Sequence, residues 1–317
     1  MTAVEVTTIN FQQKVASDAN TIFLIDCLSE NDKQSARIRH EGICDTLMAQ
    51  STQGIFHDTS RVYHVQCKYQ GDWSTAMSKI RDACKKGLIP LVFIDGHGDA
   101  EKGLAMPLGG FIGWQEYGQD LRAITDAACG ELTVVAGFCH SFAFVEKAAQ
   151  MTEKLPFAFY FGYKDEVLTS VVEDESRLIY ESLINDGGQF LDSIALQISK
   201  YDEYDHATKL IRQVILMEIA PEALRAQEPL FTKAKFRKVI ERNLARQGKP
   251  LGEVREFIRL FLNSPPLMAD LLICRCMHDT KRRSNFKAQI FSKIGQPDQA
   301  MAALSVMMHA TRSRAGV

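Results

Sequence analysis

Two short apolar segments in the first half of the chain constrain the fold more than any other feature. Leu91–Gly98 and Leu132–His140 are rich in β-branched residues, do not alternate in polarity and contain glycine near their ends. A strand that is buried on both faces of a parallel sheet has this pattern. The residues between them include a helix-like stretch, Trp114–Ile124, and are numerous enough to form a right-handed crossover. The sequence therefore predicts two neighbouring parallel strands joined by a helix.

Each of these predicted strands ends in a residue that can take part in nucleophilic chemistry. The first ends in Asp-Gly-His-Gly, which contains His97, and the second in Gly-Phe-Cys-His-Ser, which contains Cys139. Open α/β sheets place their active sites at the carboxyl ends of parallel strands, so the two side chains should meet at one edge. A thiol beside an imidazole forms a nucleophile and its base. We therefore expect His97 and Cys139 to be a catalytic pair.

Other roles for these side chains stay open at the level of sequence. His97 could be a surface histidine, and Cys139 could be a buried, inert thiol. The polar residue after Cys139 argues against burial of the thiol. A helix should begin at Phe142, and the dipole of that helix would favour a thiolate at Cys139. His140 could serve as the base instead, but adjacent side chains at a strand exit point to opposite sides.

The rest of the first 200 residues repeats the alternation of strand and helix. Thr21–Cys27 and Val62–Lys68 are predicted strands that precede the central pair, and Phe157–Gly162 is one that follows it. Two further helices are expected at Glu175–Asn185 and Phe190–Lys200. Helical spacing of apolar residues follows each of the first two strands, at Ile38, Ile43, Leu47 and Met48, then at Trp73, Met77, Ile80 and Ala83. This order predicts an α/β fold with a doubly wound, mostly parallel sheet and helices on both faces.

The charge distribution divides the chain near residue 200. Residues 201–317 hold 20 Lys and Arg against 12 Asp and Glu, a net charge of about +8, whereas residues 1–200 hold 17 against 27, about −10. The sequence therefore predicts a domain at 1–200 and a basic, mainly helical region at 201–317. That region could bind an activating protein or a nucleic-acid-containing complex. The alternative is that its charges only solvate helix surfaces.

Composition narrows the class of protein further. No run of eighteen apolar residues occurs, and Met1–Val15 is polar, so we expect neither a membrane span nor a secretory signal, and a cytoplasmic location. The eight scattered cysteines are expected to be reduced thiols. Cys274-Arg275-Cys276 has the wrong spacing for a zinc ribbon. We therefore expect no metal and no cofactor.

The two strand ends together resemble those of the caspase-like (clan CD) cysteine peptidases, which include caspases, metacaspases, separases, gingipains and the bacterial CHAT proteins. The resembling features are Asp-Gly-His97-Gly98, a crossover of about forty residues, and Gly-Phe-Cys139-His-Ser. The later segments Tyr160–Tyr163, Ile179–Leu183 and Phe190–Ala195 look most like the CHAT branch. The likeness covers roughly residues 20–200 and does not reach the remainder.

This resemblance implies a fold and a set of roles. Cys139 would be the nucleophile, His97 the general base and acid, and the N–H groups of Gly98 and Cys139 the oxyanion hole, acting on a protein substrate after activation by a partner or signal. Fixed N–H donors of this kind contribute roughly 3–4 kcal/mol each to transition-state stabilisation. The chain differs from caspases before the nucleophile, where Ala136-Gly137-Phe138 replaces Gln-Ala. That difference argues against cleavage after aspartate.

Acidic residues at other strand exits suggest a different specificity. The resemblance implies that the exits of the first, third and fifth strands line the substrate pocket, and here they carry Asp26, Asp95, Asp165 and Glu166. Carboxylates pair bidentately with arginine and more loosely with lysine, so we expect cleavage after a basic residue, with Arg preferred and Lys accepted. Asp26 and Asp95 are favoured because each directly ends an apolar strand. Each carboxylate could instead be a turn-forming or solvated group.

Two other functional classes fit the same sequence. A catalytically silent binding or scaffold module would keep the fold without the chemistry, although such a protein need not retain both His97 and Cys139. A Cys–His hydrolase or acyltransferase acting on a small thioester would need a closed pocket rather than a peptide groove.

Overall fold

The computed structural model describes residues 19–51, 61–148, 154–186, 195–219, 233–246, 255, 258–259 and 261–295. The chain forms two compact units. The sheet unit comprises residues 1–147 and 156–200, and the helical unit comprises residues 148–155 and 201–317. The division after Lys200 falls where the charge of the chain changes sign. The assignment of residues 148–155 to the helical unit was not expected from the sequence.

A six-stranded, mostly parallel sheet forms the centre of the sheet unit, so the predicted α/β class is confirmed. All five predicted strands occur in it, and a sixth closes one edge. Every neighbouring pair is parallel except the last, which is antiparallel. In spatial order the strands are β2 (Val62–Gln66), β1 (Thr21–Asp26), β3 (Pro90–Asp95), β7 (Thr133–Gly137), β8 (Phe159–Tyr163) and β9 (Leu196–Lys200).

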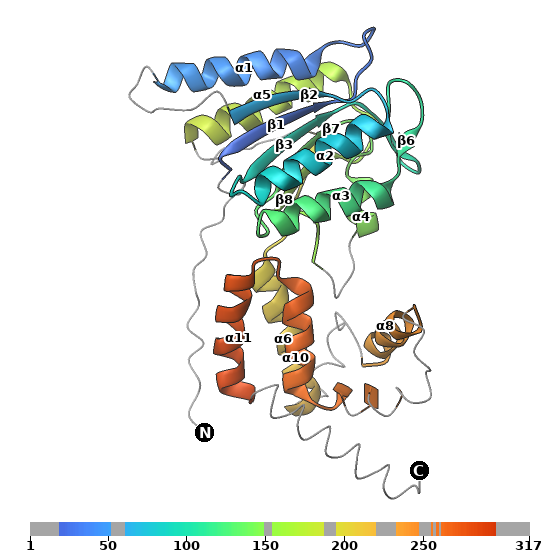
Figure 1. Ribbon diagram of the computed structural model, residues 1–317, viewed down its shortest axis with the longest axis vertical. Helices are drawn as coiled ribbons and strands as arrows, with labels where there is room; N and C mark the ends of the chain where they lie inside the picture. The colour runs from blue at the N-terminus through green and yellow to red at the C-terminus, as the bar shows by residue number, and fades with distance from the viewer. Residues whose placement is uncertain are drawn as a thin grey trace, which may run out of the picture. The chain divides into compact units, whose positions relative to one another are not determined.

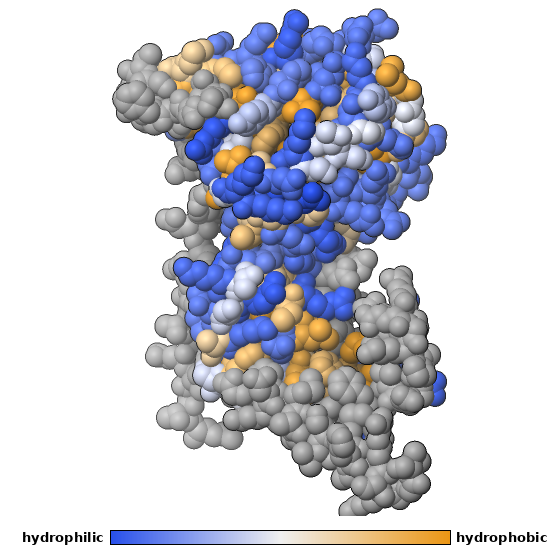
Figure 2. Space-filling model, in the orientation of Figure 1, coloured by the Kyte–Doolittle hydropathy of each residue, from blue (hydrophilic) through white to orange (hydrophobic). Residues whose placement is uncertain are grey.

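Helices cover both faces of this sheet (Figure 1). On one face lie α1 (Ser35–Ser51) and α5 (Thr169–Asp186), which pack against each other, and on the other lie α2 (Gln70–Cys84), α3 (Trp114–Ala127) and the short α4 (Ala143–Ala148). The first face is filled by aliphatic and aromatic residues of the strands and of α1 and α5, among them Leu24, Ile43, Phe93, Val135, Phe161 and Ile179. Hydrophilic residues cover most of the sheet unit on the face shown in Figure 2.

The edge strand β9 corrects one prediction. We expected a helix over Phe190–Lys200, but Leu196–Lys200 is a strand that pairs antiparallel with β8, Leu196 opposite Tyr163 and Lys200 opposite Phe159. Residues 190–194 lie outside the described part. The alternation Leu-Gln-Ile-Ser-Lys is the period-two pattern of an edge strand, and the unpaired edge of β8 supplies the hydrogen-bonding partner.

A second, smaller sheet lies within the crossover between β3 and β7. It consists of β4 (His97–Asp99), β5 (Gly103–Ala105) and β6 (Phe111–Ile112), paired antiparallel in that order. The sequence pattern did not predict this small sheet. Because β4 begins at His97, the small sheet fixes the backbone on which that histidine is carried.

Among its described residues, the helical unit contains the helices α6 (Glu203–Ile219), α8 (Lys233–Arg246), α10 (Pro265–Cys276) and α11 (Thr280–Ile294). Its core contains Leu210 and Val214 from α6 and Leu272 and Ile273 from α10, all fully or almost fully buried. In the described part of the chain, none of the helices combines the length and the apolarity that a membrane crossing requires.

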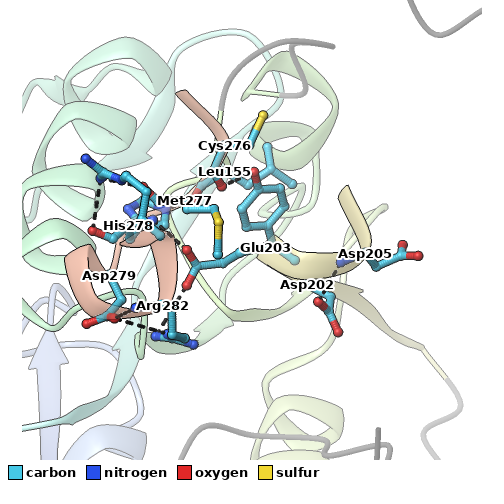
Figure 3. Close-up of polar contacts among 11 residues, drawn as sticks. Leu155, Asp202, Glu203, Asp205, Cys276, Met277, His278, Asp279 and Arg282 are labelled. Carbon is cyan, nitrogen blue, oxygen red and sulfur yellow. Dashed lines mark hydrogen bonds and ion pairs between the residues drawn. The ribbon is translucent and has the colours of Figure 1, made fainter. Parts of the chain in front are cut away.

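The turn between α10 and α11 binds both segments through which the chain enters this unit (Figure 3). The His278 ring Nε2 lies 2.9 Å from the carbonyl of Leu155, and the Tyr201 hydroxyl donates to the carbonyl of Cys276 at 2.8 Å. Glu203, at the start of α6, accepts a hydrogen bond from the His278 N–H at 2.6 Å. Burial raises the pKa of Glu203, although the nearby Arg282 opposes the rise. This turn therefore joins Leu155 to the start of α6.

The Tyr201→Phe substitution should lower the free energy of unfolding of the helical unit by about 1 kcal/mol, because it leaves the buried Cys276 carbonyl without this donor. Tyr63→Phe is the matched control, since Tyr63 lies half exposed on the edge strand β2. Denaturant unfolding of both variants measures the difference. Equal stability of the two variants would contradict the proposed contribution of the Tyr201 hydrogen bond.

Candidate active site

The register of β3 and β7 brings the two predicted catalytic residues to one edge of the sheet. Asp95 at the end of β3 pairs with Gly137 at the end of β7. His97 and Cys139 each lie two residues beyond those positions. Both therefore leave the carboxyl ends of neighbouring parallel strands, which is where α/β sheets place their sites.

Direct backbone packing holds the two strand exits together. A Cβ atom on Gly98 would lie 2.0 Å from the carbonyl oxygen of Cys139 and 2.6 Å from the ring of Phe138. No side chain fits there, so only glycine allows β4 to approach the Cys139 loop this closely. The residue after His97 thus lies against the backbone of Cys139.

Trp114, at the start of α3, contacts the segments that follow both β3 and β7. Its indole Nε1 donates to the carbonyl of Ala100, in the turn after β4, at 2.9 Å. Its ring stacks on Phe138, with centroids 6.3 Å apart, so the residue before Cys139 is held in an aromatic cluster. Lys147 of α4 adds a second donor to Ala100 at 2.7 Å. One side chain therefore anchors the His97 hairpin and the Cys139 loop together.

The loop from Cys139 to Ser141 is also held by the exit of β8. His140 has a φ of 57°, an uncommon conformation for a residue other than glycine, and its N–H donates to the carbonyl of Asp165 at 3.2 Å. The buried Ser141 hydroxyl donates to Ala136 and accepts from the N–H of Tyr163 at 2.8 Å. These bonds determine where the Cys139 backbone lies. They also direct the His140 ring to the carbonyl of Lys164 at 3.2 Å.

The Cys139 thiol is half buried and has a specific neighbour. The N–H of Val167 lies 3.4 Å from its sulfur and can donate to it. The thiol can in turn donate to the carbonyl of Val167 at 3.7 Å. The helix α4 has only six residues and begins four residues after Cys139. The effect of its dipole on the Cys139 thiol is therefore smaller than we expected from the sequence.

The His97 side chain is 67% exposed, and its Nε2 lies 3.2 Å from Oδ1 of Asp32. Asp32 belongs to the loop after β1 and was not among the predicted site residues. Within the described residues, His97 and Cys139 do not hydrogen-bond to each other; the recorded partner of the Cys139 sulfur is Val167. The two side chains are thus attached to adjoining backbone segments, but they are not hydrogen-bonded to each other.

The two favoured carboxylates have partners inside the protein. Asp26 is 1% exposed, accepts from the N–H of Leu28 at 3.1 Å and lies 3.0 Å from the Nε2 of His64. Asp95 is equally buried and forms an ion pair with Arg39 of α1. Burial raises the pKa of the Asp95 carboxyl, and Arg39 acts against that rise. Both carboxylates therefore stabilise the sheet edge from within.

The other two predicted binding residues have a different environment. Asp165 and Glu166 follow β8 and are exposed, in the loop whose carbonyls bind His140. They lie immediately before Val167, which contacts the Cys139 sulfur. Of the four predicted carboxylates, these are the two that solvent reaches.

Arg39 and Asp32 were not predicted as site residues, although the position of each in the sequence gives a signal. Arg39 precedes Ile43 and Leu47 by four and eight residues, so it lies on the apolar stripe of α1, where an arginine needs a buried partner. Asp32 follows the first strand and is therefore at the same sheet edge as His97. Among the described residues, no three His, Cys, Asp or Glu side chains gather in a way that could hold a metal ion.

Asp95→Ala should lower the free energy of unfolding of the sheet unit by about 3–5 kcal/mol, because it leaves the buried Arg39 guanidinium without its carboxylate. Asp165→Ala, which removes an exposed carboxylate, should change it by about 0.5 kcal/mol or less. Chemical denaturation of both variants provides the measurement. An Asp95→Ala protein as stable as the parent would show that the ion pair is not structural.

Comparison with known proteins adds no assignment, since no family model matches the chain and no curated protein matches it either.

Proposed function

We propose that this chain is a cysteine endopeptidase with a caspase-like sheet domain, in which Cys139 is the nucleophile and His97 the general base and acid. The observation that carries the proposal is the contact of Gly98 with the Cys139 carbonyl. It supports the proposal because it joins the two chemically competent strand exits directly through backbone. A thiol and an imidazole so placed suit acyl transfer.

The proposed reaction begins with transfer of the Cys139 thiol proton to His97. The sulfur attacks the carbonyl carbon of the scissile peptide bond, and the N–H groups of Gly98 and Cys139 stabilise the oxyanion that forms. His97 then donates its proton to the departing amine, which leaves a thioester on Cys139. Water, deprotonated by His97, hydrolyses that thioester and restores the thiol.

Activation by a partner or signal is part of this proposal. His97 is mostly exposed and the Cys139 sulfur faces Val167, so the resting pair needs a rearrangement of side chains before proton transfer. Catalytic hydrogen bonds commonly tighten only when substrate is bound. A binding partner of the basic helical unit, either a protein or a nucleic-acid-containing complex, is the proposed source of the signal.

Cleavage after a basic residue, with Arg preferred over Lys, remains the proposed specificity. Asp26 and Asp95 are buried and have partners, so a substrate guanidinium would have to displace His64 or Arg39 to reach them. Asp165 and Glu166 need no such displacement, because they are exposed beside the Cys139 loop. We therefore assign recognition of the basic side chain first to Asp165 and Glu166.

A catalytically silent binding module is the second candidate. It is favoured by the same lack of a hydrogen bond between His97 and Cys139 in the described chain. The two candidates differ in whether Cys139 ever becomes acylated by a peptide substrate.

Cys139→Ala and His97→Ala should each reduce proteolysis by about 10³-fold or more, since removing either member of such a pair removes the nucleophile or its base. Activity is measured on the full chain with a basic-residue acyloxymethyl ketone probe and a peptide library, with and without candidate activators. The matched controls are Cys129→Ala, which removes an exposed thiol, and His140→Ala. Full activity in Cys139→Ala or His97→Ala would rule out the mechanism. A loss of activity in His140→Ala as large as that in His97→Ala would contradict the assignment of His97 as the base.

Mapping of cleavage sites by mass spectrometry should show cuts mainly after Arg, with fewer after Lys. The double substitution Asp165→Asn, Glu166→Gln should reduce cleavage after Arg by roughly tenfold or more, because charged hydrogen bonds to the substrate contribute about 1.5–3 kcal/mol. Cleavage of other sequences by the variant should change little. Cuts mainly after Asp, Asn or apolar residues in the parent would rule out recognition of a basic side chain.

A further inference from the structure

The contact between Asp32 and His97 has no role in the mechanism described so far. Oδ1 of Asp32 lies 3.2 Å from Nε2 of His97, and Asp32 itself is 28% exposed. Asp32 comes from the loop after β1, which is the neighbour of β3 in the sheet. The loop after β1 therefore reaches His97, which follows the neighbouring strand β3.

The Asp32 carboxylate is held in place independently of His97. Its Oδ2 accepts from the N–H of Ser29 at 2.8 Å, while its own N–H donates to the carbonyl of Ser29 at 3.1 Å. The Gln34 side chain donates to the carbonyls of both residues. Partial burial alone would raise the pKa of Asp32, but the hydrogen bonds from Ser29 and the contact with His97 lower it below its ordinary value. The loop thus presents a fixed, ionised acceptor.

An ionised carboxylate can only accept hydrogen bonds, so the ring nitrogen that faces it must carry the hydrogen. In a neutral imidazole the other nitrogen then has the free lone pair. We propose that Asp32 is a positioning residue that holds His97 in its Nε2–H tautomer, which makes Nδ1 the atom that takes the proton from Cys139. The role of Nδ1 as a base rests on the proposed function; the tautomer itself does not.

The same carboxylate also acts after proton transfer. The imidazolium carries hydrogen on both nitrogens, and Asp32 then faces a positive charge through Nε2 while the thiolate faces it through Nδ1. The His97 side chain is largely exposed, so solvent weakens this ion pair and its effect on rate is moderate. Orientation of the ring and choice of tautomer are the larger contributions.

The first experiment measures the tautomer directly, by nitrogen NMR of the His97 ring in the full chain labelled with ¹⁵N-histidine. The parent should show the Nε2–H form alone, and Asp32→Ala should show a mixture of both tautomers. Glu30→Gln is the matched control, because Glu30 is on the same loop and pairs with Lys68 rather than with His97. An Nδ1–H ring in the parent, or the same tautomer ratio in Asp32→Ala as in the parent, would overturn the proposal.

The second experiment measures alkylation of Cys139 by iodoacetamide at neutral pH, followed by peptide mapping to separate it from the other cysteines. The rate is measured with and without the candidate activators, and in the rearranged state, in which His97 contacts the thiol, Asp32→Asn should slow alkylation about fivefold, the effect expected for an exposed ion pair. Asp32→Glu should restore part of the rate. Glu30→Gln should leave it unchanged. If Asp32 only shapes its loop, its variants will lower the thermal stability of the sheet unit without changing the tautomer, which contradicts the proposal.

These readouts separate the inference from the proposed function. An Nε2–H ring that depends on Asp32, in a protein that cleaves no peptide after addition of any activator, would leave the tautomer assignment standing and remove the peptidase. Proteolysis that depends on Cys139 and His97, in a protein whose His97 tautomer is the same in Asp32→Ala as in the parent, would do the reverse.

Discussion

The contact of Gly98 with the Cys139 carbonyl is the constraint on which the rest of the site depends. It requires β3 and β7 to be parallel neighbours in the observed register, because a shift by one residue would replace glycine by a residue with a side chain. It also requires a hairpin after β3 rather than a free loop, and Trp114 holds that hairpin in place. Backbone packing therefore determines the positions of the segments that carry His97 and Cys139 at this edge.

The acidic residues at the strand ends illustrate how burial divides similar sequence positions into different roles. Asp26 and Asp95 end adjacent strands in the same register, and both are held inside by cationic or hydrogen-bonding partners. An isolated buried carboxylate would be prohibitively costly, so Arg39 has to lie on the otherwise apolar face of α1. Asp32 and Asp165 come a few residues later and reach solvent. Distance along the chain from the end of the strand separates structural from accessible carboxylates.

Much of the sheet could be predicted from the sequence, because buried parallel strands leave continuous apolar runs such as Leu91–Asp95 that no other element explains as well. The same rule placed His97 and Cys139 at one edge. The rule could not identify β9, because its short alternating pattern also fits a helix. The pattern favours a strand only once the unpaired edge of β8 is known. The rule also missed the partner of Asp95, since Arg39 is 56 residues away along the chain and only the packing of α1 on the sheet brings the two together. Contacts of this kind depend on tertiary structure rather than on local pattern.

The two units do not divide the chain at a single point. The segment 148–155 begins at the last residue of α4, a helix that starts four residues after Cys139. It nevertheless belongs to the helical unit, where Leu155 contacts the ring of His278 and Lys154 donates to Arg275. The chain therefore passes between the two units three times, and a single cut after residue 200 would leave the polar backbone of Lys154 and Leu155 without these partners. Loss of the α10–α11 turn would remove the hydrogen-bonding partners of Lys154 and Leu155, whereas the Ser141 hydrogen bonds would still hold the Cys139 loop to β8.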